Sequence, residues 1–89
     1  MKHASHPAVI TRLKRAHGHL ASVLAMFEEG RSCLDLAQQL HAVESAVANA
    51  KRELIHDHIE HCLDVDAGGA SPAEARAALR EFKALAKYL

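Results

Sequence analysis

An unbroken run of helix-forming residues in the middle of the chain places the strongest limit on its fold. Between Ser32 and Leu63 there is no Pro or Gly, and Ser32 and Asp35 have the spacing of a capping box. Apolar residues in this run recur at alternating steps of four and three, namely Leu36, Leu40, Val43, Val47, Ala50 and Leu54. The pattern predicts one helix over residues 32–63 with a heptad-like seam. A helix this long in so small a protein usually packs against a copy of itself.

The segments on either side of this run predict two shorter helices. Apolar residues at helical spacing predict a helix over 6–29, which ends at Gly30 as helices often do. Ser71-Pro72-Ala73-Glu74 is typical of a helix start and predicts a helix over 72–88. The stretch 64–70, which contains two glycines, is the predicted linker. We therefore expect a single all-α domain over residues 1–89.

The composition suggests a thin core and a cytosolic protein. Half of the residues are hydrophobic, but there are no Trp, one Tyr and two Phe among them. A monomeric core made mostly of Ala and Leu buries little surface, so oligomerisation is expected. No apolar run reaches the roughly 18 residues of a membrane span, and no signal-peptide pattern opens the chain. We expect a cytoplasmic protein without a membrane partner, in which thiols stay reduced.

Charge is unevenly distributed although the net charge is zero. Arg12, Lys14 and Arg15 precede the first acid, Glu28. A later stretch contains acids but no Lys or Arg, and these acids are Glu53, Asp57, Glu60, Asp64 and Asp66. One region is thus positive and another acidic. A solvated helix face explains each run as well as a binding surface does.

Two residues near the end of the long helix have the spacing of metal ligands. His58 and Cys62 lie four residues apart, so their side chains project from the same side of a helix, one turn apart. An imidazole and a thiolate at this spacing suit a late transition metal. Two ligands rarely hold a metal tightly, and Cys33 is the only other thiol. The sequence therefore predicts a metal site of Cys33, His58 and Cys62.

The positions of these ligands predict that the site forms between two chains. Cys33 and His58 are 25 residues apart, which is roughly 37 Å along one continuous helix. Metal–sulfur bonds are only about 2.3 Å long, so one chain cannot close the site. Two antiparallel copies of the helix place Cys33 of one chain beside His58 and Cys62 of the other, and symmetry gives two equivalent sites. Cys33 also lies in a first helical turn, where the dipole favours a thiolate that reacts with metals or electrophiles.

Other readings of the same residues are less specific. A lone cysteine in a helix is often a small buried hydrophobe, and a lone histidine is often structural. A disulfide between Cys33 and Cys62 across a dimer would need an oxidising compartment. An enzyme is not expected, because the Cys–His pair has no recognisable orienting group or oxyanion donor.

Three stretches of the chain resemble the CsoR/RcnR family of bacterial metal-sensing repressors. Residues 12–18 (RLKRAHG) resemble its R-L-x-R-x-x-G signature, and residues 33–43 resemble its C-x-D…Q-x-x-A-V stretch. Residues 58–62 (HIEHC) match its H-x-x-x-C ending. The resemblance implies a three-helix protomer, an antiparallel four-helix-bundle dimer and a tetramer made of two dimers. It also implies a repressor that binds operator DNA without inducer and releases it with inducer, so that an exporter is expressed.

The resemblance also suggests which residues contact DNA. The candidates are Arg12, Lys14 and Arg15 in the first helix, with Lys51 and Arg52 in the second. Such residues act mainly on phosphates, which gives binding that weakens with salt. No set of side chains looks like a base reader, so operator choice is expected to depend on DNA shape.

The inducer is less sharply specified than the site. Within the family, the Cys-His-Cys trio alone is the copper(I) site, and nickel and cobalt sensors add ligands from the N-terminal arm. His3 and His6 stand in that arm, and Ser32 occupies the position where copper sensors tend to carry a Tyr. Both points favour Ni(II) or Co(II), which prefer more nitrogen donors. The alternative for the arm histidines is a solvent-exposed, frayed segment.

Several alternatives remain open at this point. His61 is either a further ligand or a surface residue, and His17, His19, His41 and His56 are expected to be structural or to support the ligands. Within the family, Cu(I) is the second candidate inducer. A formaldehyde or persulfide sensor that reacts through Cys33 is the third candidate. From a different class, the chain could be a cytosolic metal buffer or chaperone.

Overall fold

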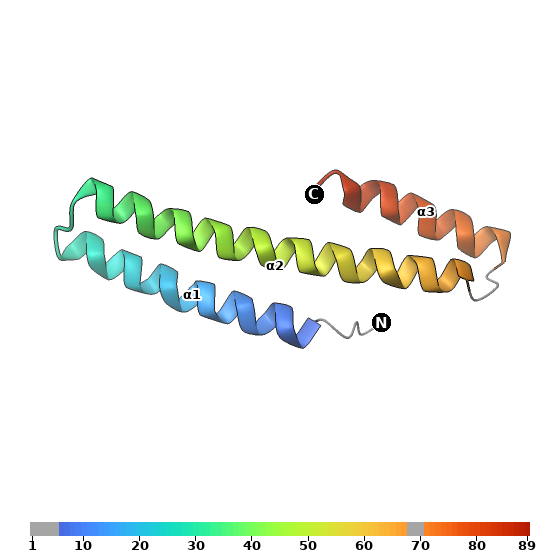
Figure 1. Cartoon of the computed structure of the whole chain (residues 1–89), viewed down its shortest axis with the longest axis horizontal. Coiled ribbons are helices and arrows are strands. Elements are labelled where there is room, and N and C mark those ends of the chain that lie inside the picture. Colours follow the sequence, from blue (N-terminus) through green and yellow to red (C-terminus); the bar gives the residue numbers. More distant parts are fainter. Residues whose placement is uncertain (1–5, 68–70) are drawn as a thin grey trace.

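The computed structural model of the chain describes residues 6–67 and 71–89, with side chains described for 6–60 and 71–89. Its elements are three helices, α1 (His6–Glu28), α2 (Cys33–Ala67) and α3 (Pro72–Ala86). α1 and α3 pack along α2 on opposite sides in the view of Figure 1, and both run antiparallel to it. Together they form a flat, elongated layer with extents of 59 × 23 × 13 Å. The predicted all-α fold of three helices is confirmed.

The turn between α1 and α2 is built around one glycine. Gly30 has a φ of 73°, a left-handed conformation that L-residues with a Cβ disfavour. The Gly30 N–H donates to the Phe27 carbonyl and the Arg31 N–H to the Met26 carbonyl, both at 3.2 Å. This is the Schellman pattern, which satisfies carbonyls at a helix end. The turn reverses the chain and lays α2 back along α1.

Serine side chains cap the other two helices as the sequence predicts. Ser32 Oγ accepts a hydrogen bond from the Asp35 N–H at 3.1 Å. Ser71 Oγ accepts one from the Glu74 N–H at 3.2 Å. Each bond satisfies one of the N–H groups that a helix start leaves without an intrahelical partner.

The predicted end of the long helix was wrong. α2 continues to Ala67 instead of ending near Leu63, so the first four residues of the predicted linker 64–70 are helical. These residues include two acids, which oppose the dipole at a helix C-terminus. None of them is Pro or Gly, however, and nothing in the segment forces the backbone out of the helix before Gly68. The bounds of α1 and α3 agree with the predicted ones to within two residues.

The predicted seam of α2 divides into two rows with different environments. An inner row lies between α1 and α2 and is 1–8% exposed; it consists of Val9, Ala16, Val23, Leu36, Val43 and Ala50. An outer row is 39–53% exposed; it consists of Leu13, Leu20, Phe27, Leu40, Val47 and Leu54. Each row repeats every seven residues along its helix. One hairpin therefore buries only half of the apolar pattern that the sequence carries.

In residues 6–67 and 71–89, no helix combines enough length with enough apolar character to cross a lipid bilayer.

Replacing the two glycines of the α1–α2 hairpin, Gly18 and Gly30, by Ala should have opposite effects on the free energy of unfolding. Gly30→Ala should lower the free energy of unfolding by about 1–2 kcal/mol, because a Cβ is strained at a positive φ. Gly18→Ala should raise it by roughly 0.5–1 kcal/mol, because Ala is the better helix former and its Cβ meets nothing within 4 Å. Urea unfolding at one fixed protein concentration measures both. An unaltered Gly30→Ala variant would contradict the described turn.

Candidate metal centre and nucleic-acid surface

Cys33 and His58 lie far apart in one chain because α2 is continuous. Cys33 is the first residue of α2 and is exposed. His58 lies in the same helix, and 25 residues of helix correspond to roughly 37 Å. Cys62 follows one turn after His58 in α2, but its side chain lies outside the description. Among the described residues of a single chain, no group of three His, Cys, Asp or Glu side chains could hold a metal ion.

His58 is held at the packing interface between α2 and α3. Its side chain is 18% exposed, and its Nε2 lies 3.2 Å from Glu81 Oε1 of α3. A carboxylate beside Nε2 is compatible with a neutral imidazole whose metal-binding lone pair lies on Nδ1. Carboxylates that orient a ligand histidine in this way are common in metal sites. The donor chemistry of His58 therefore fits a metal ligand.

Glu81 was not among the predicted site residues. Its contact with His58 depends on how α3 folds back along α2, which no local motif specifies. One signal was present nonetheless: His58 lies 12 residues before Ala70, and Glu81 lies 11 residues after it. In an antiparallel pair joined by a short connection, residues equally far from the turn lie level with each other.

The remaining histidines have different environments. His19 Nε2 lies 2.6 Å from Gln39 Oε1 and links α1 to α2 in a partly buried contact, which agrees with the structural role expected for it. His41 Nδ1 lies 4.0 Å from Glu44 Oε1, and both side chains are largely exposed. His17 and His56 are exposed.

The start of α1 lies toward the His58 end of α2. Arg12 of α1 contacts Glu53 of α2, and the two helices are antiparallel. The segment of α1 from Arg12 back to His6 therefore points in the same direction as the segment of α2 from Glu53 forward to His58. His6 is the first residue of α1 and is half-buried. His3 and the side chain of His61 lie outside the described residues.

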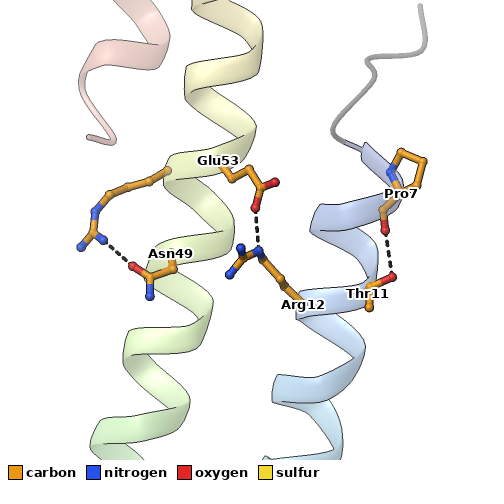
Figure 2. A network of polar contacts seen from close by, with 6 residues as sticks. Pro7, Thr11, Arg12, Asn49 and Glu53 are labelled. Atoms are coloured by element: carbon orange, nitrogen blue, oxygen red, sulfur yellow. Dashed lines mark hydrogen bonds and ion pairs between the residues drawn. The ribbon is translucent and has the colours of Figure 1, made fainter.

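The first of the predicted DNA-contact residues is paired with an acid. Arg12 Nε lies 2.7 Å from Glu53 Oε2, with side chains that are 54% and 31% exposed. Figure 2 shows the two side chains meeting between α1 and α2. A guanidinium has five N–H donors in a fixed fork, so one contact to Glu53 leaves donors for an anion. Glu53 was not predicted to lie near Arg12, because the contact depends on how α1 and α2 align.

The other basic candidates lie on exposed positions of α1 and α2. Lys14, Arg15, Lys51 and Arg52 are all exposed. Arg52 donates from its guanidinium to Asn49 Oδ1 at 2.5 Å, one helical turn away. These residues present positive charge from two adjacent helices, which suits contacts to phosphates.

Comparison with known proteins connects this geometry to one family. A family model described as a metal-sensitive transcriptional repressor matches residues 5–88. The copper-sensing transcriptional repressor CsoR of Mycobacterium ulcerans (strain Agy99) is 42% identical over 56 residues, which is 63% of this chain and 48% of that protein. The copper-sensing transcriptional repressor RicR of Mycobacterium tuberculosis (strain ATCC 25618 / H37Rv) is 35% identical over 74 residues, 76% of this chain and 77% of that one. The chain thus spans about half the length of the CsoR proteins that it matches.

A solved structure shares the arrangement of helices. The nickel-responsive transcriptional regulator InrS superposes with a TM-score of 0.83 at 27% sequence identity, covering 100% of this chain and 98% of that one. The family model also extends from the start of α1 to the end of α3. The chain therefore belongs to the family of metal-sensitive transcriptional repressors.

Proposed function

We propose that this chain is a cytoplasmic repressor that binds operator DNA in its metal-free form and releases it when Ni(II) or Co(II) binds. Release would allow expression of a metal exporter. The observation that carries the proposal is the continuity of α2, which separates Cys33 from His58 and Cys62 within one chain. We infer that these residues are the two halves of a site shared between chains. Residues 1–89 would form one domain with both the metal-sensing and the DNA-binding surface.

The outer row supports an antiparallel dimer. Its members include the largest apolar side chains of the α1–α2 hairpin, such as Leu20, Phe27 and Leu40, and all are at least 39% exposed. The inner row contains mainly Val and Ala. Burying large apolar side chains is the main favourable term in association, and a second antiparallel hairpin placed on the outer row completes a four-helix bundle. The family resemblance extends this to a tetramer of two dimers.

In such a dimer, each site takes its ligands from both chains. Cys33 at the start of α2 in one chain comes level with His58 and Cys62 near the end of α2 in the other. Thiolate and imidazole donors suit late transition metals. Glu81 behind His58 would keep the imidazole oriented, which raises metal affinity.

The choice of nickel or cobalt depends on the N-terminal arm. The helix alignment brings His6, the first residue of α1, toward the His58 end of α2. We propose that His6 and the preceding His3 add nitrogen donors of the kind that these divalent ions prefer. His61 is a further candidate ligand. Similarity to a nickel-responsive regulator over the whole chain supports this choice.

Copper(I) is the second candidate inducer. It is favoured by the higher sequence identity to proteins named copper-sensing repressors. The Cys-His-Cys trio without the arm is a soft donor set that suits Cu(I). The two candidates differ in whether His3 and His6 take part.

The structure suggests how the metal site and DNA surface are coupled. His58 and Glu53 are five residues apart on α2, and Glu53 contacts Arg12 of α1. A site that ties two hairpins together at His58, and draws on the arm that precedes α1, acts on the position of α1. A small shift of α1 moves Arg12 and Arg15 relative to phosphates, which is the linkage expected of an allosteric repressor.

The metal-free protein should bind a duplex that contains the DNA upstream of its own gene, and Ni(II) or Co(II) should release it. Fluorescence anisotropy at about 100 mM salt measures this, since phosphate contacts persist but are weakened there. Release by Cu(I) alone would assign the protein to the copper sensors. Tight metal binding without DNA binding would instead identify a metal buffer or chaperone. Arg12→Gln should weaken DNA binding, whereas Arg31→Gln at the far end of the hairpin should not.

Mixing two inactive variants tests whether the site is shared between chains. Cys33→Ser and Cys62→Ser should each lose the native two-thiolate absorption of bound Co(II), because each variant keeps only one thiolate in a site. A mixed dimer places both substitutions in one site and leaves the other site with all its native ligands. Random mixing should therefore restore about a quarter of the native sites. No recovery after unfolding and refolding the variants together would show that the ligands come from one chain.

Removing the carboxylate behind His58 should weaken metal binding without disturbing the fold. Glu81→Ala is expected to raise the metal Kd roughly 10–100-fold, the usual effect of losing a partner that orients a ligand. Glu74→Ala is the matched control, because Glu74 lies two turns earlier on the same side of α3. Competition with a chromophoric chelator measures both. Equal affinities for the two variants would exclude an orienting role for Glu81.

A further inference from the structure

α3 carries a row of basic residues that the sequence analysis did not assign to any function. Arg76, Arg80, Lys83 and Lys87 follow one another at steps of four, three and four. At 3.6 residues per turn these steps keep all four within an arc of about 60° on the helix. All four are exposed. We call this row the α3 basic stripe.

The stripe has no internal counter-charge in the described part of the chain. The ion pairs described for residues 6–60 and 71–89 involve none of its four side chains. The two acids of α3, Glu74 and Glu81, project from a different side of the helix, and Glu81 is engaged with His58. Four like charges on adjacent turns repel one another weakly, and an anion bound along the stripe would offset this repulsion.

The C-terminal end of the stripe lies level, along the helix axes, with basic residues already expected to contact DNA. The contact between His58 and Glu81 sets the register of α3 on α2. α2 and α3 are antiparallel (Figure 1). Moving six residues forward in α3, from Glu81 to Lys87, therefore covers the same distance in the same direction as moving six residues back in α2, from His58 to Arg52. Lys87 therefore lies level with Arg52. Arg12 contacts Glu53, the next residue of α2, so each of the three helices contributes a basic residue at this level.

The dimensions of the stripe fit one strand of a DNA duplex. From Arg76 to Lys87 it extends about 16 Å along α3. One strand of B-DNA presents a phosphate roughly every 3.4 Å along the duplex axis, so the stripe spans about five phosphates. Long, flexible Lys and Arg side chains one turn apart can follow such a row without reading base edges.

We propose that the α3 basic stripe is a second phosphate-binding surface, which extends the DNA footprint from α1 and α2 onto α3. This proposal rests on the proposed function as a DNA-binding repressor. The stripe adds affinity but not sequence preference, because it offers charge rather than a pattern of donors and acceptors suited to base edges. An anionic lipid surface would use the same charges, and the experiment below separates the two partners.

The test compares the full-length metal-free protein with the variant Arg80→Gln/Lys83→Gln/Lys87→Gln. Gln keeps a long side chain and a good helix propensity. Anisotropy is measured between about 50 and 200 mM salt on the upstream duplex and on a scrambled duplex of equal length. The variant should bind both duplexes more weakly, and its slope of log K against log salt should fall by at least about 2. The ratio of the two affinities should stay the same.

Two controls distinguish the stripe from a general charge effect. The first control compares two variants that each lose one positive charge, Arg31→Gln and Lys83→Gln. Arg31 pairs with Glu29 far from α3, so the salt slope of Arg31→Gln should match that of the wild type. Oligomeric state by sedimentation and Co(II) affinity should be unchanged in the triple variant, which shows that the fold is retained.

The outcomes separate this proposal from the proposed function. If the wild type binds the upstream duplex and the triple variant keeps the wild-type affinity and salt slope, the stripe is not a DNA surface, although the repressor function stands. If the wild type binds neither duplex, both proposals fail. A triple variant with unaltered DNA binding that no longer sediments with phosphatidylglycerol vesicles, while the wild type does, would assign the stripe to a lipid surface and overturn the proposal.

Discussion

The length and continuity of α2 are the constraint on which the rest of this structure depends. Backbone hydrogen bonds hold its 35 residues in one rod, so residues at its two ends cannot approach each other within a chain. If the thiol that opens the helix and the imidazole near its end bind one metal ion, as we propose, a partner chain must supply one of them. The same helix provides the surface on which α1 and α3 pack. The way they align along it determines which α2 residues their side chains contact.

The distribution of apolar side chains along this rod follows from size as well as from spacing. Small residues such as Ala16 and Ala50 lie in the inner row and are almost fully buried, which allows α1 and α2 to approach closely. Larger residues lie in the outer row and stay exposed in one chain. Burial of this exposed apolar surface would be favourable, which is the physical basis of the proposed dimer.

Local chemistry made much of this fold predictable from the sequence. The contacts between helices could not be predicted in this way. Gly30, Ser32 and Ser71 act on their own neighbours, so the ends that they define were predicted correctly. The end of α2 was misplaced because acidic residues before Gly68 resemble a linker although they are compatible with a helix. The trio of Cys33, His58 and Cys62 was proposed from spacing alone. The contacts of Glu53 and Glu81 depend on the alignment of packed helices, which single-chain periodicity does not specify.

The way in which α3 is attached has a consequence for the dynamics of the protein. None of its residues is buried, so α3 packs on α2 without a buried anchor of its own. Helices of this kind open locally at a much lower free energy than the elements that carry the core. α3 is thus the part of the chain that separates from the hairpin first, in fluctuations that leave α1 and α2 paired. Each such opening breaks the contact between Glu81 and His58, so the orientation of the His58 imidazole is as transient as the docking of the third helix.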